Sequence, residues 1–527
     1  MKTLPTYSGC SCCSMSRRDF LAAAGCGAAC AGVLGALSTP APVRAFATGA
    51  KFRVRILFAL HADVQPRPDW PNIGYDFRPV MERTTTALRQ GCPEFEFVTA
   101  TATGPEETAK IVEADKTAEI DGYIVVQMNC WNRVVQTVVA TGKPTIYSDF
   151  LYAGSGGFLV YNAGFLRAGV ENYGFVSSQR LEDLVAAARC FDVIRKGGTV
   201  ADFTAATAKV RHDRTKKPDD MQCKPDEVDL LPISDCLEKV KGAKILAVEK
   251  GWLDLAKLGT DATAGIECVN VPFAEVNAAW EAADRDQSIE IAERWQKAAK
   301  VIQDVERETL IKSAAMYLAQ KEVMKKHGAI AITINCLGGF YGGHIHAYPC
   351  LGFHELLNEG LIGACECDTR STFTMAMVNA LTNGRPGYIS DPVIDTSTNQ
   401  VIYAHCVATN KPFGPQGPAN PFEILTHSED RQGAAVRSIL PVGYMTTSLE
   451  FAPDRKQILF HQAKAVDNIP EDRACRTKLA AEPVGDIEKL FGQWDRWGWH
   501  RVTYYGDLKE PIFALADALG WEVLEEA

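Results

Sequence analysis

The order of strand and helix patterns between residues 53 and 150 constrains the fold of this chain more than any other feature. Short apolar runs typical of buried strands alternate there with amphipathic runs typical of helices. This alternation is typical of parallel βαβ units, in which a helix connects two neighbouring strands. The expected strands are 54–60, 95–101, 120–129 and 143–150, and the expected helices are 76–90, 106–116 and 131–141.

The loop after the first expected strand lacks the pattern of a dinucleotide-binding site. It contains no GxGxxG, and residues 61–70 read HADVQPRPDW, which is a polar loop. Open α/β sheets bind ligands beyond the carboxyl ends of their strands, where His61 and Asp63 are expected to lie. The sequence therefore favours a Rossmann-like parallel sheet that does not bind a dinucleotide.

The pattern continues into a second α/β block near residue 173 and changes near residue 386. Strand-like runs at 243–249 and 329–336 enclose residues 274–328, which are nearly all helix formers. After residue 386, shorter alternating runs indicate an antiparallel sheet or barrel. We expect two tandem Rossmann-like α/β domains followed by a β-rich C-terminal domain, with the bounds 48–172, 173–385 and 386–527.

The first 47 residues have the pattern of an export signal. Residues 16–21 read SRRDFL, the twin-arginine form, and a run of Ala, Gly, Cys and Leu follows. The segment 45–47, Ala-Phe-Ala, places small residues at the alternate positions that a signal peptidase accepts. No later apolar stretch reaches the length of about 18 residues that a membrane span needs. We predict export by the twin-arginine machinery to the periplasm or the cell exterior.

Composition excludes one class of partner and one class of scaffold. The net charge of -10 argues against binding to a nucleic-acid backbone, which requires a basic face. Five of the 17 cysteines lie in the export signal, and the remaining twelve are too sparse for a disulfide scaffold. No pair of CxxC motifs occurs, so a structural zinc site is not expected. Buried free thiols are the predicted state of these cysteines.

The tetrad Cys365, Glu366, Cys367 and Asp368 stands directly before a helix-like run and leaves several interpretations open. If residues 363–368 end a strand, the two thiols share one face and the two carboxylates share the other. A thiolate metal site would need further soft ligands nearby, and a redox pair usually has the CxxC spacing. A carboxylate site and a simple helix cap by Glu366 and Asp368 both agree with the residue types.

Three residues downstream favour the carboxylate site. Asp391 ends the run YISD, His405 lies within the run YAHC, and His500 precedes the run RVTYY. Each therefore stands at the edge of an apolar strand-like segment. Carboxylate oxygens and imidazole nitrogens suit Mn²⁺, Mg²⁺, Co²⁺ or Fe²⁺ better than a soft metal.

The order of these motifs resembles the L-fucose/L-arabinose isomerase superfamily. The shared pattern is CE-x-D, a helix, (Y/F)-x-x-D, AHC and a closing H-x(3,5)-YG-D followed by a helix and a strand. The resemblance covers essentially the whole mature chain and implies a divalent metal, commonly Mn²⁺, with Glu366, Asp391 and His500 as its ligands. His405 matches a further ligand that the arabinose branch uses and the fucose branch lacks. Neither cysteine of the tetrad has a role in the family.

The resemblance implies a metal-dependent aldose–ketose isomerase that acts on a monosaccharide through an ene-diol. Glu366 and Asp391 would be both metal ligands and proton carriers. The family also implies a homo-oligomer, trimeric or hexameric, whose sites lie at subunit interfaces. Export departs from the family pattern, because these isomerases normally act in the cytoplasm. The alternatives are an exported sugar-binding protein without turnover and a metal-dependent sugar epimerase or lyase.

Four further residues are candidates for contact with a sugar. His344 and His346 share one face of an extended segment in a Gly-rich loop, where a plain exposed loop is the competing interpretation. Arg370 could orient hydroxyl groups or pair with Asp368. Trp499 could stack on a sugar, although core packing is the usual role of such a residue.

Overall fold

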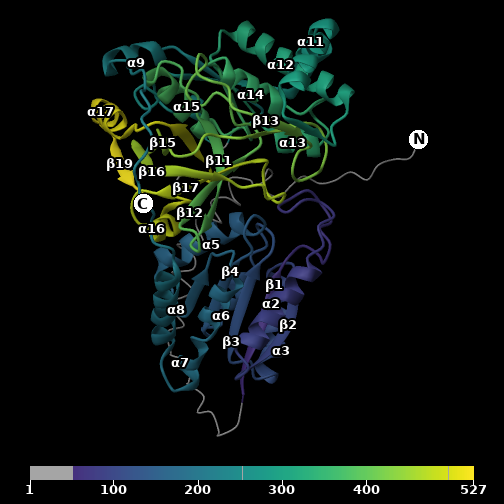
Figure 1. The fold of residues 1–527 in the computed structure, drawn as a ribbon, viewed down its shortest axis with the longest axis vertical. Helices are drawn as coiled ribbons and strands as arrows, with labels where there is room; N and C mark the ends of the chain where they lie inside the picture. The colour runs from purple at the N-terminus through teal and green to yellow at the C-terminus, as the bar shows by residue number, and fades with distance from the viewer. Residues whose placement is uncertain (1–50, 252, 497) are drawn as a thin grey trace, which may run out of the picture.

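The structure is a computed structural model and describes residues 51–251, 253–496 and 498–527. Three units follow one another along its long axis, with an α/β unit at each end and a β-barrel between them (Figure 1). The barrel is last in the sequence but central in space, so it contacts both α/β units. This architecture confirms the expected fold class. The predicted export signal, residues 1–47, lies outside the described residues.

The first unit is built on a five-stranded parallel sheet with the strand order β2-β1-β3-β4-β5. Every residue of the central strand β3 is buried, whereas the edge strand β2 alternates between buried and exposed residues. This difference is expected, because helices cover both faces of a parallel sheet. The strands are β1 Phe52–Ala59, β2 Phe95–Ala102, β3 Gly122–Gln127, β4 Thr145–Asp149 and β5 Tyr173–Val176.

Helices cover both faces of this sheet because successive residues of β1 point to opposite sides. Ile56 packs in one cluster with Leu88 of α2 and Leu184 of α6. Leu57 packs in another cluster with Val135 of α4 and Phe158 of α5. The helices of the unit are α2 Arg78–Gly91, α3 Pro105–Thr117, α4 Val134–Val139, α5 Ser155–Ala168, α6 Leu181–Ala188, α7 Phe191–Arg195 and α8 Val200–Arg214.

The first unit extends beyond the boundary expected at residue 172. β5 pairs with β4 in the same sheet, with Tyr173 opposite Thr145, and α8 packs against β5. The boundary therefore falls between two strands of one sheet, and the unit ends with α8 at Arg214. Pairing with a neighbouring strand decides which sheet a strand joins, and the local pattern of residues carries no such information.

The second unit contains a four-stranded parallel sheet with the order β10-β9-β6-β7. The expected helical stretch 274–328 forms three helices, α10, α11 and α12, and the short strand β8 separates the last two. β8 joins β13 and β14 of the C-terminal part in a three-stranded sheet. The elements are β6 Lys244–Val248, β7 Glu267–Val271, β8 Val301–Gln303, β9 Ala331–Ile334, β10 Ile362–Ala364, β13 Phe422–Leu425, β14 Ala435–Ser438, α9 Ile233–Val240, a 3-10 helix Leu255–Lys257, α10 Phe273–Glu281, α11 Arg285–Ala298, α12 Arg307–His327, α13 Cys336–Tyr341, α14 Cys350–Asn358 and α15 Thr369–Leu381.

The barrel consists of six antiparallel strands that pair in the closed order β11-β12-β17-β16-β15-β18. The last strand, β19, adds to β16 in parallel. Closure leaves no free edge among the six strands, which a sheet of this size otherwise exposes. The elements are β11 Tyr388–Asp395, β12 Gln400–His405, β15 Met445–Ala452, β16 Gln457–Asn468, β17 Thr477–Pro483, β18 Arg501–Tyr505, β19 Glu522–Glu525, α16 Ile487–Gln493 and α17 Lys509–Leu519.

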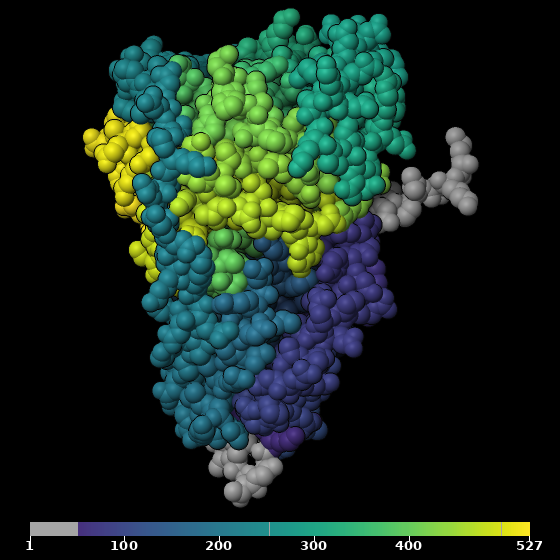
Figure 2. Space-filling model, in the orientation of Figure 1, coloured from purple at the N-terminus to yellow at the C-terminus, as the bar shows by residue number. Residues whose placement is uncertain are grey.

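An extended segment, residues 215–232, connects the two α/β units along the outside of the barrel. Figure 2 shows it in teal along the left edge of the molecule. Its backbone amides donate to carbonyl oxygens along its length, from Lys216 to Thr396 at 3.0 Å and from Lys224 to Gly443 at 2.7 Å. These bonds hold the connection against the barrel.

We expect Gly154→Ala to lower the free energy of unfolding by about 1–3 kcal/mol, the usual cost of overpacking. Gly154 lies before α5, and an added Cβ would stand 1.9 Å from the backbone oxygen of Gln127, which cannot rotate away. Urea denaturation measures the effect. Gly164→Ala in α5 is the matched control, because an added Cβ there meets no atom within 4 Å and alanine favours a helix interior. Equal stability of Gly154→Ala and the wild type would contradict the expectation.

Candidate metal centre

Three neighbouring barrel strands bring together polar residues that are far apart in the sequence. β11 lies between β12 and β18, with Asp391 opposite Ala404 and Ser390 opposite Arg501. The next residue after Ala404 is His405, and the residue before Arg501 is His500. The strand register therefore places Asp391, His405 and His500 side by side at one end of the barrel.

The tetrad residue Glu366 reaches the same place from the second α/β unit. β10 ends at Ala364, and a turn that leads into α15 follows. The backbone amide of Cys367 in this turn donates to the carbonyl oxygen of Ile334, at the carboxyl end of β9, at 2.9 Å. The site thus lies at the carboxyl edge of a parallel sheet, where α/β folds place their ligands.

The strand-end alternation considered for residues 363–368 is wrong. Glu366 and Cys367 have φ values of 62° and 50°, which is the left-handed region that residues with a side chain rarely adopt. The chain must turn from β10 into α15 within four residues, and an extended backbone cannot do this. Each left-handed residue costs about 1–3 kcal/mol, and such strain concentrates at functional sites. Here it directs the Glu366 side chain toward the barrel histidines.

Two carboxylates and two imidazoles form a compact group that can hold a metal ion. One ligand atom from each of Glu366, Asp391, His405 and His500 lies within 4.8 Å of all the others. Nε2 of His500 is 3.1 Å from Asp391 Oδ1 and 3.6 Å from Glu366 Oε2, and Nε2 of His405 is 3.8 Å from Glu366 Oε1. All four residues singled out in the sequence as metal ligands are therefore together.

Asp391, His405 and His500 are buried and Glu366 is partly buried, and the electrostatics of the group favour a bound cation. Burial raises the pKa of Glu366 to about 7, and the charges of Asp391 and Asp368 act in the same direction. Burial alone would lower the pKa of His500, but Glu366, Asp368 and Asp391 together hold it well above its ordinary value. Burial would raise the pKa of Asp391, but the hydrogen bond from His500 keeps it below its ordinary value. The raised pKa values of Glu366 and His500 both indicate that positive charge, carried by a proton or by a cation, is stabilised among these carboxylates.

His405 supplies an independent indication that a ligand belongs here. Its side chain is 2% exposed, and among the described residues neither ring nitrogen has a hydrogen-bond partner. Burial lowers the pKa of its imidazole, which favours the neutral form that binds metals. A buried polar atom without a partner costs about 1–3 kcal/mol. A divalent cation among these four side chains would satisfy it, so the donor set fits such an ion.

Asp368 and Trp499 orient the group from outside. His500 Nδ1 lies 2.9 Å from Asp368 Oδ2, which leaves Nε2 directed at the carboxylates. The Trp499 indole N–H donates to Asp391 Oδ1 at 2.6 Å. Hydrogen bonds of this kind to metal-binding side chains fix their orientation. The sequence interpretation considered Asp368 as a helix cap and Trp499 as a sugar platform or core residue, and these two contacts were missed.

Asp368 is also the helix cap that the sequence suggested. Its Oδ1 accepts from the backbone amides of Arg370 and Ser371 at 3.0 Å each, at the start of α15. The cap interpretation therefore holds for Asp368, while Glu366 belongs to the group of four. An acidic residue directly before a helix is a weak sequence signal for a partner of a distant histidine.

We expect Trp499→Phe to weaken binding of Mn²⁺ by about 10–100-fold, as is usual when a partner of a metal-binding side chain is removed. Phenylalanine keeps an aromatic ring but cannot donate to Asp391. Titration with Mn²⁺ in a calorimeter measures the affinity. Trp521→Phe is a suitable control, because Trp521 packs against Phe373 and Phe451. Unchanged affinity in Trp499→Phe would contradict the orienting role.

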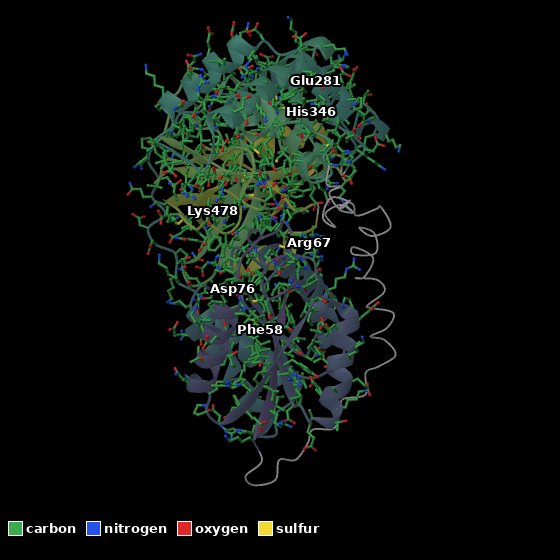
Figure 3. The ribbon with its side chains drawn as sticks, turned by 90° about the vertical axis from the view of Figure 1, so that its right-hand side faces the viewer. Phe58, Arg67, Asp76, Glu281, His346 and Lys478 are labelled. Carbon is green, nitrogen blue, oxygen red and sulfur yellow. The ribbon has the colours of Figure 1, made fainter. Side chains whose placement is uncertain are left out.

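The remaining candidates for sugar contact have other neighbours. The His344 ring stacks on Phe273 with a centroid distance of 6.1 Å. His346 Nδ1 lies 3.6 Å from Glu281 Oε1 on α10, and Figure 3 places this pair at the outer part of the second unit. Both histidines thus lie against side chains of α10. A role of either histidine in sugar binding stays a prediction.

Arg370 and His61 are held by acidic partners. The Arg370 guanidinium pairs with Asp454 at 2.9 Å and not with Asp368. The contact between Arg370 and Asp368 is made by the Arg370 backbone amide. His61 Nε2 lies 2.8 Å from Asp69 in the same loop. This loop is fixed to the C-terminal part of its own chain, because the amide of Ile73 donates to the carbonyl oxygen of Glu429. Contact of Arg370 with a sugar stays a prediction, and so does ligand binding in the loop that contains His61.

The cysteines are free, and most are buried. Of the twelve in the described chain, only Cys223 and Cys268 are partly exposed. Cys365 Sγ contacts Cys336 Sγ at 3.1 Å, and burial raises the pKa of Cys367 well above its ordinary value. The two thiols of the tetrad are thus packed in the interior.

Comparison with known proteins links this chain to sugar isomerases over part of its length. It is 26% identical over 219 residues to a sulfoquinovose isomerase from Clostridium sp. (strain MSTE9), covering 39% of this chain and 46% of that protein. It is 25% identical over 222 residues to the sulfoquinovose isomerase of Priestia megaterium, covering 41% and 48%. The chain thus spans about half the length of the curated relatives it matches. No protein-family model matches the chain.

Solved structures add little. A sugar ABC transporter from Yersinia enterocolitica covers 56% of this chain and 69% of its own, at 12% identity and a TM-score of 0.17. A periplasmic solute-binding protein from Actinobacillus succinogenes, with bound D-allose, covers 54% and 78% at 10% identity and the same TM-score. Likenesses this slight carry no conclusion about fold or function.

Proposed function

We propose that this protein is a divalent-metal-dependent aldose–ketose isomerase of the L-fucose/L-arabinose type. The observation that carries the proposal is the compact group of Glu366, Asp391, His405 and His500, which come from two different units. The partial similarity of the chain to sulfoquinovose isomerases supports the same reaction class. A sugar-binding protein has no need of two acids placed beside two buried imidazoles.

The reaction moves a proton between C1 and C2 of an open-chain sugar through an ene-diol, and negative charge develops on O1 and O2. Glu366, Asp391 and His500 would hold the cation, with His405 available as a fourth ligand. The oxygen and nitrogen donors suit Mn²⁺, with Mg²⁺, Co²⁺ and Fe²⁺ as alternatives. When bound, it supplies Lewis-acid stabilisation of these oxygens.

Glu366 and Asp391 carry the proton in this proposal. The Glu366 side chain is 19% exposed and the Asp391 side chain 7%, so Glu366 is more accessible to a substrate. Asp391 is held by the N–H of Trp499, which fixes its position. We assign the first proton transfer to Glu366 and the complementary transfer to Asp391. His405 binds the cation or donates to a sugar hydroxyl group.

Metal analysis combined with isotope exchange tests the proposal. The purified chain is assayed for bound metal and then incubated with Mn²⁺ and a panel of aldoses in D₂O, including fucose, arabinose and sulfoquinovose. We expect deuterium at C2 of the recovered aldose together with formation of the ketose. NMR measures both. Absence of bound metal together with no exchange on any aldose would overturn it. Exchange without ketose would favour an epimerase, and sugar binding without exchange would favour a binding protein.

We further propose that the protein works outside the cytoplasm as a homo-oligomer, trimeric or hexameric. The twin-arginine form at residues 16–21 supports export, and the family resemblance supports assembly. Cell fractionation of the wild type and of a variant with both arginines changed to lysine tests export. Retention of the variant in the cytoplasm is expected. Light scattering of the purified chain tests assembly, and a monomer would contradict it.

A further inference from the structure

A row of buried polar groups leads from His500 away from the candidate metal centre and into the barrel. His500 Nδ1 lies 2.9 Å from Asp368 Oδ2, and the Ser371 hydroxyl lies 2.9 Å from the same oxygen. The Ser371 hydroxyl is also 3.1 Å from Glu450 Oε2. The exposed fractions of His500, Asp368, Ser371 and Glu450 are 1%, 3%, 0% and 1%. The four residues form a continuous hydrogen-bonded chain that water does not reach.

The backbone holds the members of this chain opposite one another. Asp368 caps α15, and Ser371 lies in its first turn. Glu450 belongs to β15, and β15 pairs with β18, which directly follows His500. The amide of Phe451, next to Glu450, donates to the Thr374 hydroxyl at 2.9 Å, so α15 is bonded directly to β15. The chain therefore joins the second α/β unit to the barrel beside the metal-binding residues.

The accepting capacity of Asp368 is filled. Two backbone amides donate to its Oδ1, while His500 Nδ1 and the Ser371 hydroxyl are bound to its Oδ2. A carboxylate with two oxygens offers about four acceptor positions. With these four positions occupied by donors, Asp368 only accepts, and Nδ1 of His500 carries the proton between the two residues.

The Ser371 hydroxyl can donate only one proton, and it lies closer to Asp368 Oδ2, at 2.9 Å, than to the two oxygens of Glu450, at 3.1 and 3.3 Å. With that proton directed to Asp368, the Ser371 oxygen can only accept from Glu450, whose carboxyl group is then the donor. Burial and the nearby charge of Asp368 raise the pKa of Glu450 well above its ordinary value, which agrees with a neutral carboxylic acid. The direction of every hydrogen bond follows: Glu450 donates to Ser371, Ser371 donates to Asp368, and His500 donates to Asp368.

We propose that Ser371 and Glu450 are positioning residues for the metal centre: through Asp368 they hold the His500 ring with Nε2 directed at Glu366 and Asp391. Neither residue touches the reacting atoms. The inference rests on the proposed function for the presence of a metal. Loss of Ser371 leaves Asp368 with an unfilled acceptor position, and loss of Glu450 leaves Ser371 without its donor, so the His500 ring is less firmly oriented.

Mn²⁺ affinity of the purified full chain tests the proposal, measured by titration calorimetry on Ser371→Ala, Glu450→Leu and Glu450→Gln. Ser371→Ala and Glu450→Leu are expected to bind Mn²⁺ about 10–100-fold more weakly than the wild type. Glu450→Gln is expected to retain the affinity within a few-fold, because its amide N–H can still donate to Ser371. This rescue distinguishes a donor from a residue that only fills space.

Thr382→Val is the matched control for Ser371→Ala. Thr382 is also buried and directly follows the last residue of α15, and its hydroxyl donates to the Val378 carbonyl at the far end of the helix. Thermal unfolding without metal is expected to show a similar loss of stability in the two variants, while only Ser371→Ala loses Mn²⁺ affinity. Unchanged Mn²⁺ affinity in Ser371→Ala, or an affinity of Glu450→Gln as low as that of Glu450→Leu, would overturn the proposal.

The outcomes separate this inference from the proposed function. A wild type that binds Mn²⁺ and isomerises no sugar overturns the function and leaves the inference standing if the variants behave as expected. A wild type that binds Mn²⁺ with variants that are unchanged overturns only the inference. A wild type that binds no divalent metal overturns both. Should Ser371→Ala fail to fold, the comparison of Glu450→Gln with Glu450→Leu decides.

Discussion

Glu366→Gln is expected to lower kcat for aldose–ketose isomerisation by about 10²–10⁴-fold, the usual contribution of a proton-transferring side chain. Glutamine keeps the size and one oxygen of the side chain but cannot accept the substrate proton. Its neutral amide also removes one of the two negative charges that face His405 and His500. Bound Mn²⁺ and kcat are measured on the same preparation, so that loss of metal and loss of the proton carrier are separated.

Two further variants accompany this expectation: Asp391→Asn is a second test of the site, and Glu482→Gln is the control. Asp391→Asn is expected to behave as Glu366→Gln does, because Asp391 is the second carboxylate of the group. Glu482 is an equally buried barrel acid, but it pairs with Lys216 on the connecting segment. Glu482→Gln is therefore expected to keep its kcat and to lose only stability. Full activity in both Glu366→Gln and Asp391→Asn would show that the site assignment is wrong.

The largest loss of stability is expected from Glu526→Ala, at about 3–5 kcal/mol, the cost of breaking a buried ion pair. Glu526 and Arg501 have no exposed side-chain surface, and Arg501 Nε is 2.8 Å from Glu526 Oε1. His461 Nδ1 is 3.0 Å from the same oxygen. Alanine would leave the Arg501 charge buried without its carboxylate. Urea denaturation at pH 7 measures the loss.

The same carboxyl group predicts how stability depends on pH. Burial would raise the pKa of Glu526, but Arg501 lowers it to about 2, whereas an unfolded glutamate titrates near 4.3. A folded pKa below the unfolded value contributes stability above about pH 4.3, and that stability is lost as the pH falls toward 2. The difference in unfolding free energy between the wild type and Glu526→Ala is therefore expected to shrink between pH 5 and pH 2.

Glu525→Gln is the control for both measurements. Glu525 is the neighbouring residue, but its side chain is 52% exposed and pairs with Lys509 at the surface. Exposed ion pairs contribute little, so a change within about 0.5 kcal/mol is expected at every pH. A loss in Glu525→Gln equal to that in Glu526→Ala would point to a general effect of the chain end and contradict the ion-pair explanation.

The Glu526 ion pair also bears on the candidate metal centre. Arg501 Nη1 donates to the carbonyl oxygen of His500 at 2.8 Å, so the last residues of the chain help to hold the histidine in place. Glu526→Ala is therefore expected to weaken Mn²⁺ binding as well as stability. Nothing in the residue pattern near the C-terminus indicates this link, because Glu526 and His500 are 26 positions apart and meet only through the barrel.

Much of the fold could be read from local patterns. Alternating apolar and amphipathic runs predicted the βαβ order of the first unit, and short alternating runs predicted the antiparallel barrel. The boundary at residue 172 could not be read in this way. β5 has the same kind of apolar pattern whichever sheet it joins, and its pairing with β4 is a contact between distant segments.

The tetrad shows the limit within a few residues. Alternation was a reasonable expectation for an apolar run that ends in Cys365 and Glu366, but two successive left-handed residues replaced it. No common residue type signals that conformation, since glycine is absent from the turn. Tertiary contacts, such as the bond from the Cys367 amide to Ile334, compensate for the strain.

The sequence by itself determined which residues have the chemistry for a divalent-metal site: two acids and two histidines beside apolar strands, in an order that resembles sugar isomerases. Only the tertiary structure decided that the four residues Glu366, Asp391, His405 and His500 meet. It also decided that Asp368 and Trp499 are bonded to them, and that Ser371 links Asp368 to Glu450. The physical reason is that these contacts join segments up to 134 residues apart along the chain. Closed strand pairing and helix packing bring such segments together. Neither the composition nor the local residue pattern indicates which distant segments will meet.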